Sequence, residues 1–292
     1  MACGIALSAF GGCHRADEPA DALPRVGVTA SYIECAVRDL APEQFRVVRL
    51  LPPGGCPGHF DVTPRMIDSL RGSALLFRFD FQGSLDAKLE RMRAAGLEVV
   101  AISPGGGLSV PETYETTCKV VCEALSARWP ARASGFASRL ASVRRRLDEL
   151  RDRCHEQVAA AGLRGTKVLC SGHQEAFCRW LGLDVAGTFP RGEDSRISEY
   201  ANCIETGRRH GVAIIVANQQ EGTRVAEKLS KQLGVRLVVF SNFPSMTEGQ
   251  RTFDQLCWAN VEALVGTATT APAPASVPKK VSAASSAGGD RP

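Results

Sequence analysis

Short apolar runs alternate with amphipathic stretches along most of the chain. The apolar runs fall into two sets of four, at 26–30, 45–51, 74–79 and 97–103, and then at 167–170, 183–188, 212–217 and 235–241. Strand-like runs that alternate with helix-like stretches are typical of parallel sheets covered by helices on both faces. The pattern therefore predicts two α/β lobes, each with a mainly parallel four-stranded sheet.

One long amphipathic stretch separates the two sets of strands. Apolar residues recur in it at spacings of three and four, at Phe136, Leu140, Val143, Leu147, Leu150, Cys154 and Val158. This stripe predicts a single helix over 132–161, about 45 Å long at 1.5 Å per residue. Such a helix is long enough to join both lobes as a rigid backbone. Ligands of open parallel sheets collect beyond the carboxyl ends of the strands, so we expect a ligand cleft between the lobes.

The predicted organisation has five parts, which differ in composition and patterning. They are a signal-like segment and tether over 1–23, an N-terminal lobe over 24–130, the linking helix over 131–163, a C-terminal lobe over 164–266 and a tail over 267–292. The tail consists largely of Ala, Pro, Ser, Thr and Lys and is too polar to form a core, so we expect it to be disordered.

Composition narrows the class of protein. The chain has 292 residues, 44% of them hydrophobic and 23% charged, which is ordinary for a globular protein. No apolar run reaches the roughly 18 residues of a membrane-spanning helix. The net charge is only +4 and is spread thinly, so we expect no nucleic-acid partner.

The N-terminal segment carries a possible export signal. A short apolar stretch ends in Gly-Gly-Cys at Cys13, and small residues directly before a cysteine resemble a lipoprotein cleavage site. Lipidation of Cys13 would anchor the protein to a membrane, in the periplasm or at the cell surface. The alternative is an unprocessed terminus, because no Lys or Arg precedes the apolar stretch.

Two of the five histidines follow strands in matching loops. Cys56-Pro-Gly-His59 follows the second predicted strand, and Cys170-Ser-Gly-His173 follows the fifth. One interpretation is that the two imidazoles meet across the cleft on a metal ion. The other is that each is a loop residue bonded to backbone. The repeated pattern favours metal ligation.

The first of these loops resembles a known family. The sequence over 51–64, LPPGGCPGHFDVTP, is similar to the metal-ligand loop of the periplasmic zinc- and manganese-binding proteins of ABC transporters, the ZnuA and TroA type. The resemblance extends more weakly over about 26–265. It implies a monomeric, non-enzymatic receptor that captures a divalent transition metal between its lobes and delivers it to a membrane permease. Zinc is favoured, with manganese and iron as alternatives.

The resemblance also implies four metal-ligand positions. They fall on His59, Glu112, His173 and Asn242. A carboxylate is a competent metal ligand, whereas the neutral amide of Asn242 would weaken the site. Both histidine loops carry an extra glycine relative to the family pattern, which moves the imidazoles.

Three alternatives remain open at this stage. Cys56 and Cys170 lie three residues before the histidines and could add thiolate ligands, although a cysteine at a strand end is more often a small buried hydrophobe. A metal-dependent hydrolase could use the same cleft, but the chain has no HExxH motif or nucleophile elbow. The altered ligand positions also allow a degenerate family member that binds another small solute.

Overall fold

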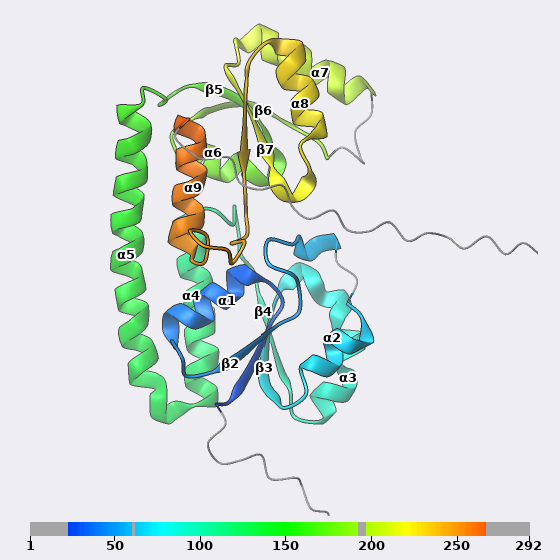
Figure 1. Cartoon of the computed structure of the whole chain (residues 1–292), viewed down its shortest axis with the longest axis vertical. Coiled ribbons are helices and arrows are strands. Elements are labelled where there is room, and N and C mark those ends of the chain that lie inside the picture. The colour runs from blue at the N-terminus through cyan, green and yellow to red at the C-terminus, as the bar shows by residue number, and fades with distance from the viewer. Residues whose placement is uncertain (1–22, 60–61, 192–196, 267–292) are drawn as a thin grey trace, which may run out of the picture.

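The computed structural model describes residues 23–59, 62–191 and 197–266, and these form two α/β lobes joined by one long helix (Figure 1). The first lobe has four parallel strands in the order β2-β1-β3-β4, and the second has four in the order β6-β5-β7-β8. The prediction of two parallel four-stranded sheets is thus confirmed. The strands are β1 (Arg25–Val28), β2 (Arg46–Arg49), β3 (Ser73–Phe79), β4 (Glu98–Ile102), β5 (Lys167–Ser171), β6 (Asp184–Phe189), β7 (Ile214–Asn218) and β8 (Arg236–Phe240).

Helices and short 3-10 turns connect the strands. The α-helices are α1 (Ser31–Leu40), α2 (Pro64–Ser69), α3 (Asp86–Ala94), α4 (Pro111–Arg128), α5 (Ala133–Ala160), α6 (Glu175–Trp180), α7 (Ile197–His210), α8 (Arg224–Leu233) and α9 (Phe253–Val265). Short 3-10 turns are η1 (Pro57–His59), η2 (Asp80–Leu85), η3 (Pro130–Arg132), η4 (Gly172–Gln174) and η5 (Gln219–Glu221). None of the described helices is both long and apolar enough to span a membrane.

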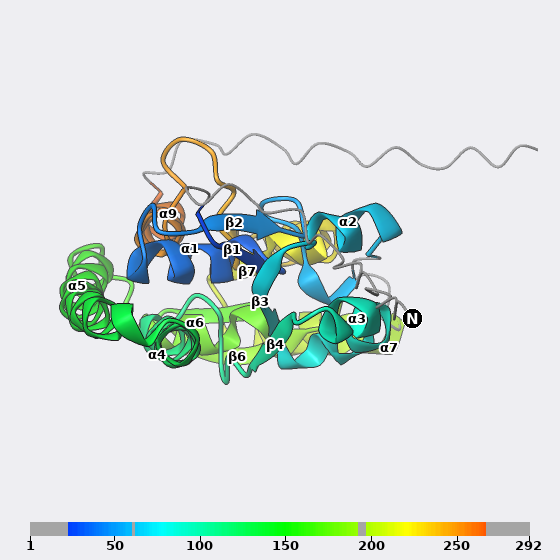
Figure 2. The same ribbon diagram turned by 90° about the horizontal axis from the view of Figure 1, so that it is seen from below.

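Helix α5 is the predicted connecting helix. Six residues of the predicted stripe are buried along it, and Leu140 packs partly buried against the same core. In both views α5 lies on one side of the molecule, and α2 and α3 lie on the other (Figure 1 and Figure 2). One hydrophobic core runs continuously through both lobes, from Val26 in β1 to Phe240 in β8. A core shared by both lobes favours small tilting motions over wide opening.

Helix α9 makes a second connection between the lobes, which the sequence pattern did not predict. It follows β8 of the second lobe, yet its first residue, Phe253, stacks on Tyr114 of α4 with ring centroids 4.1 Å apart. The same ring meets the edge of Tyr32 in α1 at 5.9 Å. Thr252 caps α9 by accepting a hydrogen bond from the Gln255 backbone at 3.2 Å, which fixes where the helix begins.

Candidate ligand site between the lobes

A cleft of about 820 Å³ lies where loops of both lobes face one another. It lies beyond the carboxyl ends of strands from both sheets, where the sequence analysis expected it. The first lobe contributes Cys56, Pro57, Gly58, Asp80, Phe81 and residues 103–108. The second lobe contributes Gly172, His173, Glu175, Ala176, Arg179, Arg191, Asn218, Gln220, Glu221, Asn242 and Phe243.

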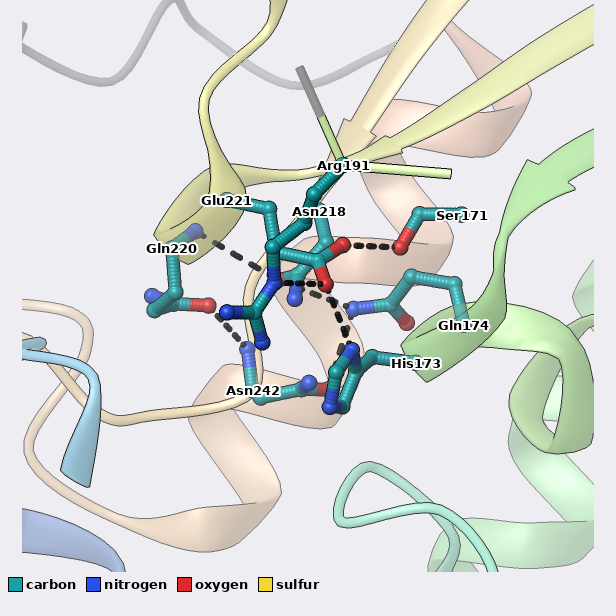
Figure 3. Close-up of polar contacts among 8 residues, drawn as sticks. All are labelled: Ser171, His173, Gln174, Arg191, Asn218, Gln220, Glu221 and Asn242. Carbon is teal, nitrogen blue, oxygen red and sulfur yellow. Dashed lines mark hydrogen bonds and ion pairs between the residues drawn. The ribbon is translucent and has the colours of Figure 1, made fainter. Parts of the chain in front are cut away.

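Glu221 is the centre of a charged group in the second lobe (Figure 3). Its carboxylate accepts a hydrogen bond from the hydroxyl of Ser171. It also lies 2.6 Å from Nδ1 of His173 and 3.1 Å from Nε of Arg191. Burial alone would raise the pKa of Glu221, but the hydrogen bonds from His173, Ser171 and Arg191 outweigh burial and lower the pKa to about 2. Glu221 is therefore a carboxylate already engaged by three neighbours.

A layer of side-chain amides lies beside this charged group (Figure 3). Nε2 of Gln174 donates to Oδ1 of Asn242 at 3.0 Å and to Oδ1 of Asn218 at 3.4 Å. Oε1 of Gln220 accepts a hydrogen bond from the Asn242 backbone at 3.0 Å. Gln174 is fully buried. Asn218 and Asn242 are only 3% and 2% exposed but line the cleft, as does the half-buried Gln220. This layer presents neutral donors and acceptors rather than charge.

Three side-chain hydrogen bonds, from Gln220 and Ser109, connect the described residues of the two lobes at the cleft. Nε2 of Gln220 donates to the backbone carbonyl of Gly54 in the first lobe at 3.2 Å. The hydroxyl of Ser109, just before α4, bonds Oδ1 of Asn242 at 3.0 Å and the carbonyl of Ser241 at 3.1 Å. Asn242 therefore takes part in an inter-lobe contact as well as in the amide layer.

The structure brings three of the proposed ligand residues to the cleft. His173, Asn242 and Cys56 line it. His173 is the most accessible of them, with 55% of its side chain exposed. Cys170 is fully buried in β5 and does not line the cleft, as expected of a small hydrophobe at a strand end.

The remaining proposed residues lie elsewhere or outside the described residues. Glu112 is exposed in the first turn of α4 and is not among the cleft-lining residues, where the loop before α4 presents Gly105, Gly106 and Gly107 instead. The backbone of His59 closes η1, but its side chain lies outside the described part, as does Cys13. Over the described residues, no group of three or more His, Cys, Asp and Glu side chains is placed to hold a metal ion.

Sequence reasoning missed Glu221, Arg191 and Gln220. Gln220 and Glu221 follow β7 directly, so the rule that ligands gather at strand ends could have singled them out. No local signal marked Arg191, because it reaches Glu221 from a loop thirty positions away in the chain.

Gly107 of the first lobe lies close to α6 of the second lobe at the cleft. It has a φ of +81°, and a Cβ added there would lie 2.7 Å from Cβ of Ala176 in α6. Gly107→Ala should therefore lower the free energy of unfolding by about 1–3 kcal/mol through strain and overpacking, measured by urea denaturation. Gly105→Ala is the matched control, because Gly105 has a φ of +67° but nothing within 4 Å of its added Cβ. Equal losses in the two variants would show that the lobes are not in close contact at Gly107.

Solved structures share this two-lobed fold. A zinc-bound deletion mutant of ZnuA matches with a TM-score of 0.70 and 14% identity, covering 86% of this chain and all of that one. The periplasmic zinc-binding protein TroA of Treponema pallidum matches with a TM-score of 0.71 and 15% identity, covering 84% of this chain and 98% of that one. The manganese-bound periplasmic metal-binding protein of Candidatus Liberibacter asiaticus matches with a TM-score of 0.70 and 13% identity, covering 84% of this chain and 99% of that one. A search among curated proteins found no match.

The fold and the inter-lobe cleft are thus those of a two-lobed α/β protein of this structural group. The family model described as "Zinc-uptake complex component A periplasmic" matches residues 26–267, and the chain belongs to this ZnuA family. The family consists of periplasmic metal-binding proteins that work with ABC transporter permeases, not of enzymes. The resemblance seen in the sequence is therefore confirmed at the level of the family.

Proposed function

We propose that this protein is the solute-capturing component of an ABC importer. It acts outside the cytoplasm as a monomer, is tethered by a lipid on Cys13, and delivers the solute of its inter-lobe cleft to a membrane permease. The observation that carries this proposal is the cleft itself, which draws its walls from both lobes of a ZnuA-family fold. A solute between the lobes would contact both of them and so change their relative position, which would alter the surface that a permease binds.

A divalent transition metal is the first candidate cargo. Solved structures of proteins with this fold hold zinc, manganese or cadmium. Nδ1 of His173 is held by Glu221 at 2.6 Å, which leaves Nε2 as the nitrogen for a ligand. A carboxylate behind an imidazole orients it for metal binding. His59 would supply the second imidazole, with Asn242 and Cys56 as weaker or alternative donors and Glu112 as the proposed carboxylate.

A small organic solute is the second candidate cargo. The observation that favours it is the chemistry of the second-lobe wall, where neutral amides predominate and Glu221 is already engaged by three neighbours. Transition-metal sites are built from imidazole, thiolate and free carboxylate, and amide oxygens are poor substitutes. The cleft volume of about 820 Å³ also lies within the range of organic ligand sites.

Metal content of the purified protein tests the first candidate. If the cargo is a metal, the wild type should carry about one equivalent of zinc, manganese or iron by mass spectrometry, and His59→Ala/His173→Ala should carry none. His210→Ala is the control, because that histidine is exposed on α7 and does not line the cleft. Absence of metal from the wild type after incubation with each ion in turn would exclude metal cargo and leave the organic candidate.

A further inference from the structure

The cleft contains an exposed aromatic ring that a metal ion would not use. Phe81 of η2 is 53% exposed, one of four large hydrophobic side chains exposed in the described chain, and it lines the cleft. Its ring stacks on the buried Phe79 at 5.1 Å between centroids and 11° between planes. One face of the ring is thereby covered and fixed, and the exposed part lies at the cleft. A fixed ring with an accessible face is suited to stack against a flat or apolar ligand surface.

The amide layer supplies hydrogen-bonding groups from the other lobe. Gln174 engages Oδ1 of both Asn218 and Asn242 from within the protein. An amide whose oxygen is engaged on one side presents its nitrogen on the other, so Nδ2 of each asparagine is directed away from Gln174. Neither Nδ2 group bonds another described residue. These two groups are donors for a ligand with carbonyl, hydroxyl or ring-nitrogen acceptors.

Charge within the cleft walls is largely balanced. Glu221 is paired with Arg191 and His173, and Glu175 is paired with Arg179 at 2.9 Å. Asp80 is the exception, because its carboxylate accepts a hydrogen bond from the backbone of Phe81 at 2.7 Å but forms no ion pair with a described basic side chain. Acidic and basic side chains that neutralise one another create little net field for a charged ligand, and they favour an uncharged one.

Glycines give the cleft room for a molecule larger than an ion. Gly105 and Gly106 of the first lobe and Gly172 of the second line the cleft, and a Cβ added at any of them would have nothing within 4 Å. The space beside these three glycines is therefore not filled by neighbouring side chains.

We infer that the cleft binds an uncharged, ring-bearing polar solute, a sugar or a nucleobase, stacked on Phe81 and hydrogen-bonded by Asn218 and Asn242. This inference rests on the proposed role in solute capture and names the class of the cargo. Each lobe supplies one part of the recognition, so the solute would join the lobes when bound.

Isothermal titration calorimetry on the full chain tests the inference. The uncharged probes are glucose, galactose, ribose, adenine, uracil and uridine, the charged probes are glucose 6-phosphate and uridine monophosphate, and the metal probes are Zn²⁺ and Mn²⁺. We expect at least one uncharged probe to bind, and to bind more tightly than its phosphorylated form. Comparison of the sugar probes with the nucleobase probes shows which of the two kinds of ring the cleft binds.

Three variants locate the bound solute. Phe81→Ala and Asn218→Ala should each weaken binding of that probe about tenfold or more, because one loses the stacking surface and the other a donor. Ile197→Ala is the control, because Ile197 is an exposed apolar residue of α7 that does not line the cleft. Unchanged affinity in Phe81→Ala would overturn the inference, as would tighter binding of a phosphorylated probe.

The metal arm separates the two proposals. Binding of Zn²⁺ or Mn²⁺ without any uncharged probe would overturn the ring-solute inference and leave solute capture intact. Binding of no probe of any class, by a protein that unfolds cooperatively, would overturn both.

Discussion

Arg146→Ala should lower the free energy of unfolding by about 3 kcal/mol. Arg146 lies on α5 and reaches two acidic residues on different helices. Nη2 is 2.6 Å from Asp39 of α1, and Nε is 2.8 Å from Asp254 of α9. Removal of one guanidinium would leave two largely buried carboxylates without their cation.

The burial of the two carboxylates gives this effect its size. The side chains of Asp39 and Asp254 are 13% and 26% exposed, and Oδ1 of Asp254 has no hydrogen-bond partner. Burial, opposed by Arg146 and reinforced by Asp39, raises the pKa of Asp254 to about 6. Without Arg146, Asp254 would lose the larger of the two influences that lower its pKa, the smaller being a backbone hydrogen bond.

Arg145→Ala is the matched control for this prediction. Arg145 is the neighbour of Arg146 on the same helix, is exposed, and bonds only the hydroxyl of Ser142 at 3.1 Å. Its loss should change the free energy of unfolding by less than about 0.5 kcal/mol in the same urea titration. Similar losses in the two variants would mean that helix propensity, and not the ion pairs with α1 and α9, determines the effect.

The repeating elements of the fold were readable from the sequence, but this inter-lobe junction was not. Strands and helices leave periodic apolar patterns, and the stripe on α5 is one of them. The triple arginine run at 144–146 carries no sign that its third member faces two carboxylates from distant helices. Likewise, the pattern assigned α9 to the second lobe, and only tertiary packing brings Phe253 between Tyr32 and Tyr114.

The site was predicted in part, for a similar physical reason. Strand-end reasoning singled out His173, because the carboxyl ends of parallel strands meet at one edge of a sheet, and the family resemblance added Asn242. It did not show that Glu221 engages His173, since that contact joins two loops 48 positions apart. The resemblance assigned Glu112 to a ligand position because it follows a proline at the start of a helix. In the structure, the glycines at 105–107 line the cleft and Glu112 does not.

Glu221→Gln should remove about 3 kcal/mol of stability at pH 7 and progressively less as the pH falls below 4.5. The pKa of Glu221 is about 2 in the folded protein, against an ordinary value of 4.5. A carboxyl whose pKa is depressed by folding stabilises the native state above its unfolded pKa, and that contribution is lost as the pH falls toward the folded pKa. At 1.36 kcal/mol per pKa unit, the interval corresponds to about 3 kcal/mol.

Urea denaturation of metal-free protein at pH 7, 4.5, 3.5 and 3 would measure this difference. The gap between wild type and Glu221→Gln should be constant from pH 7 to about 5 and should shrink by about 2 kcal/mol between pH 4.5 and 3. Asp254 has the opposite pH dependence. Its pKa is raised by folding, so its contribution to the stability of the native state is lost as the pH rises from about 4 to 6. Both proteins contain Asp254, so this contribution cancels in the difference between them. Glu175→Gln, at an exposed pair on α6, should change stability by no more than about 0.5 kcal/mol throughout. A gap for Glu221→Gln that stays the same down to pH 3 would show that the shape of this side chain, and not its charge, holds Ser171, His173 and Arg191 in place.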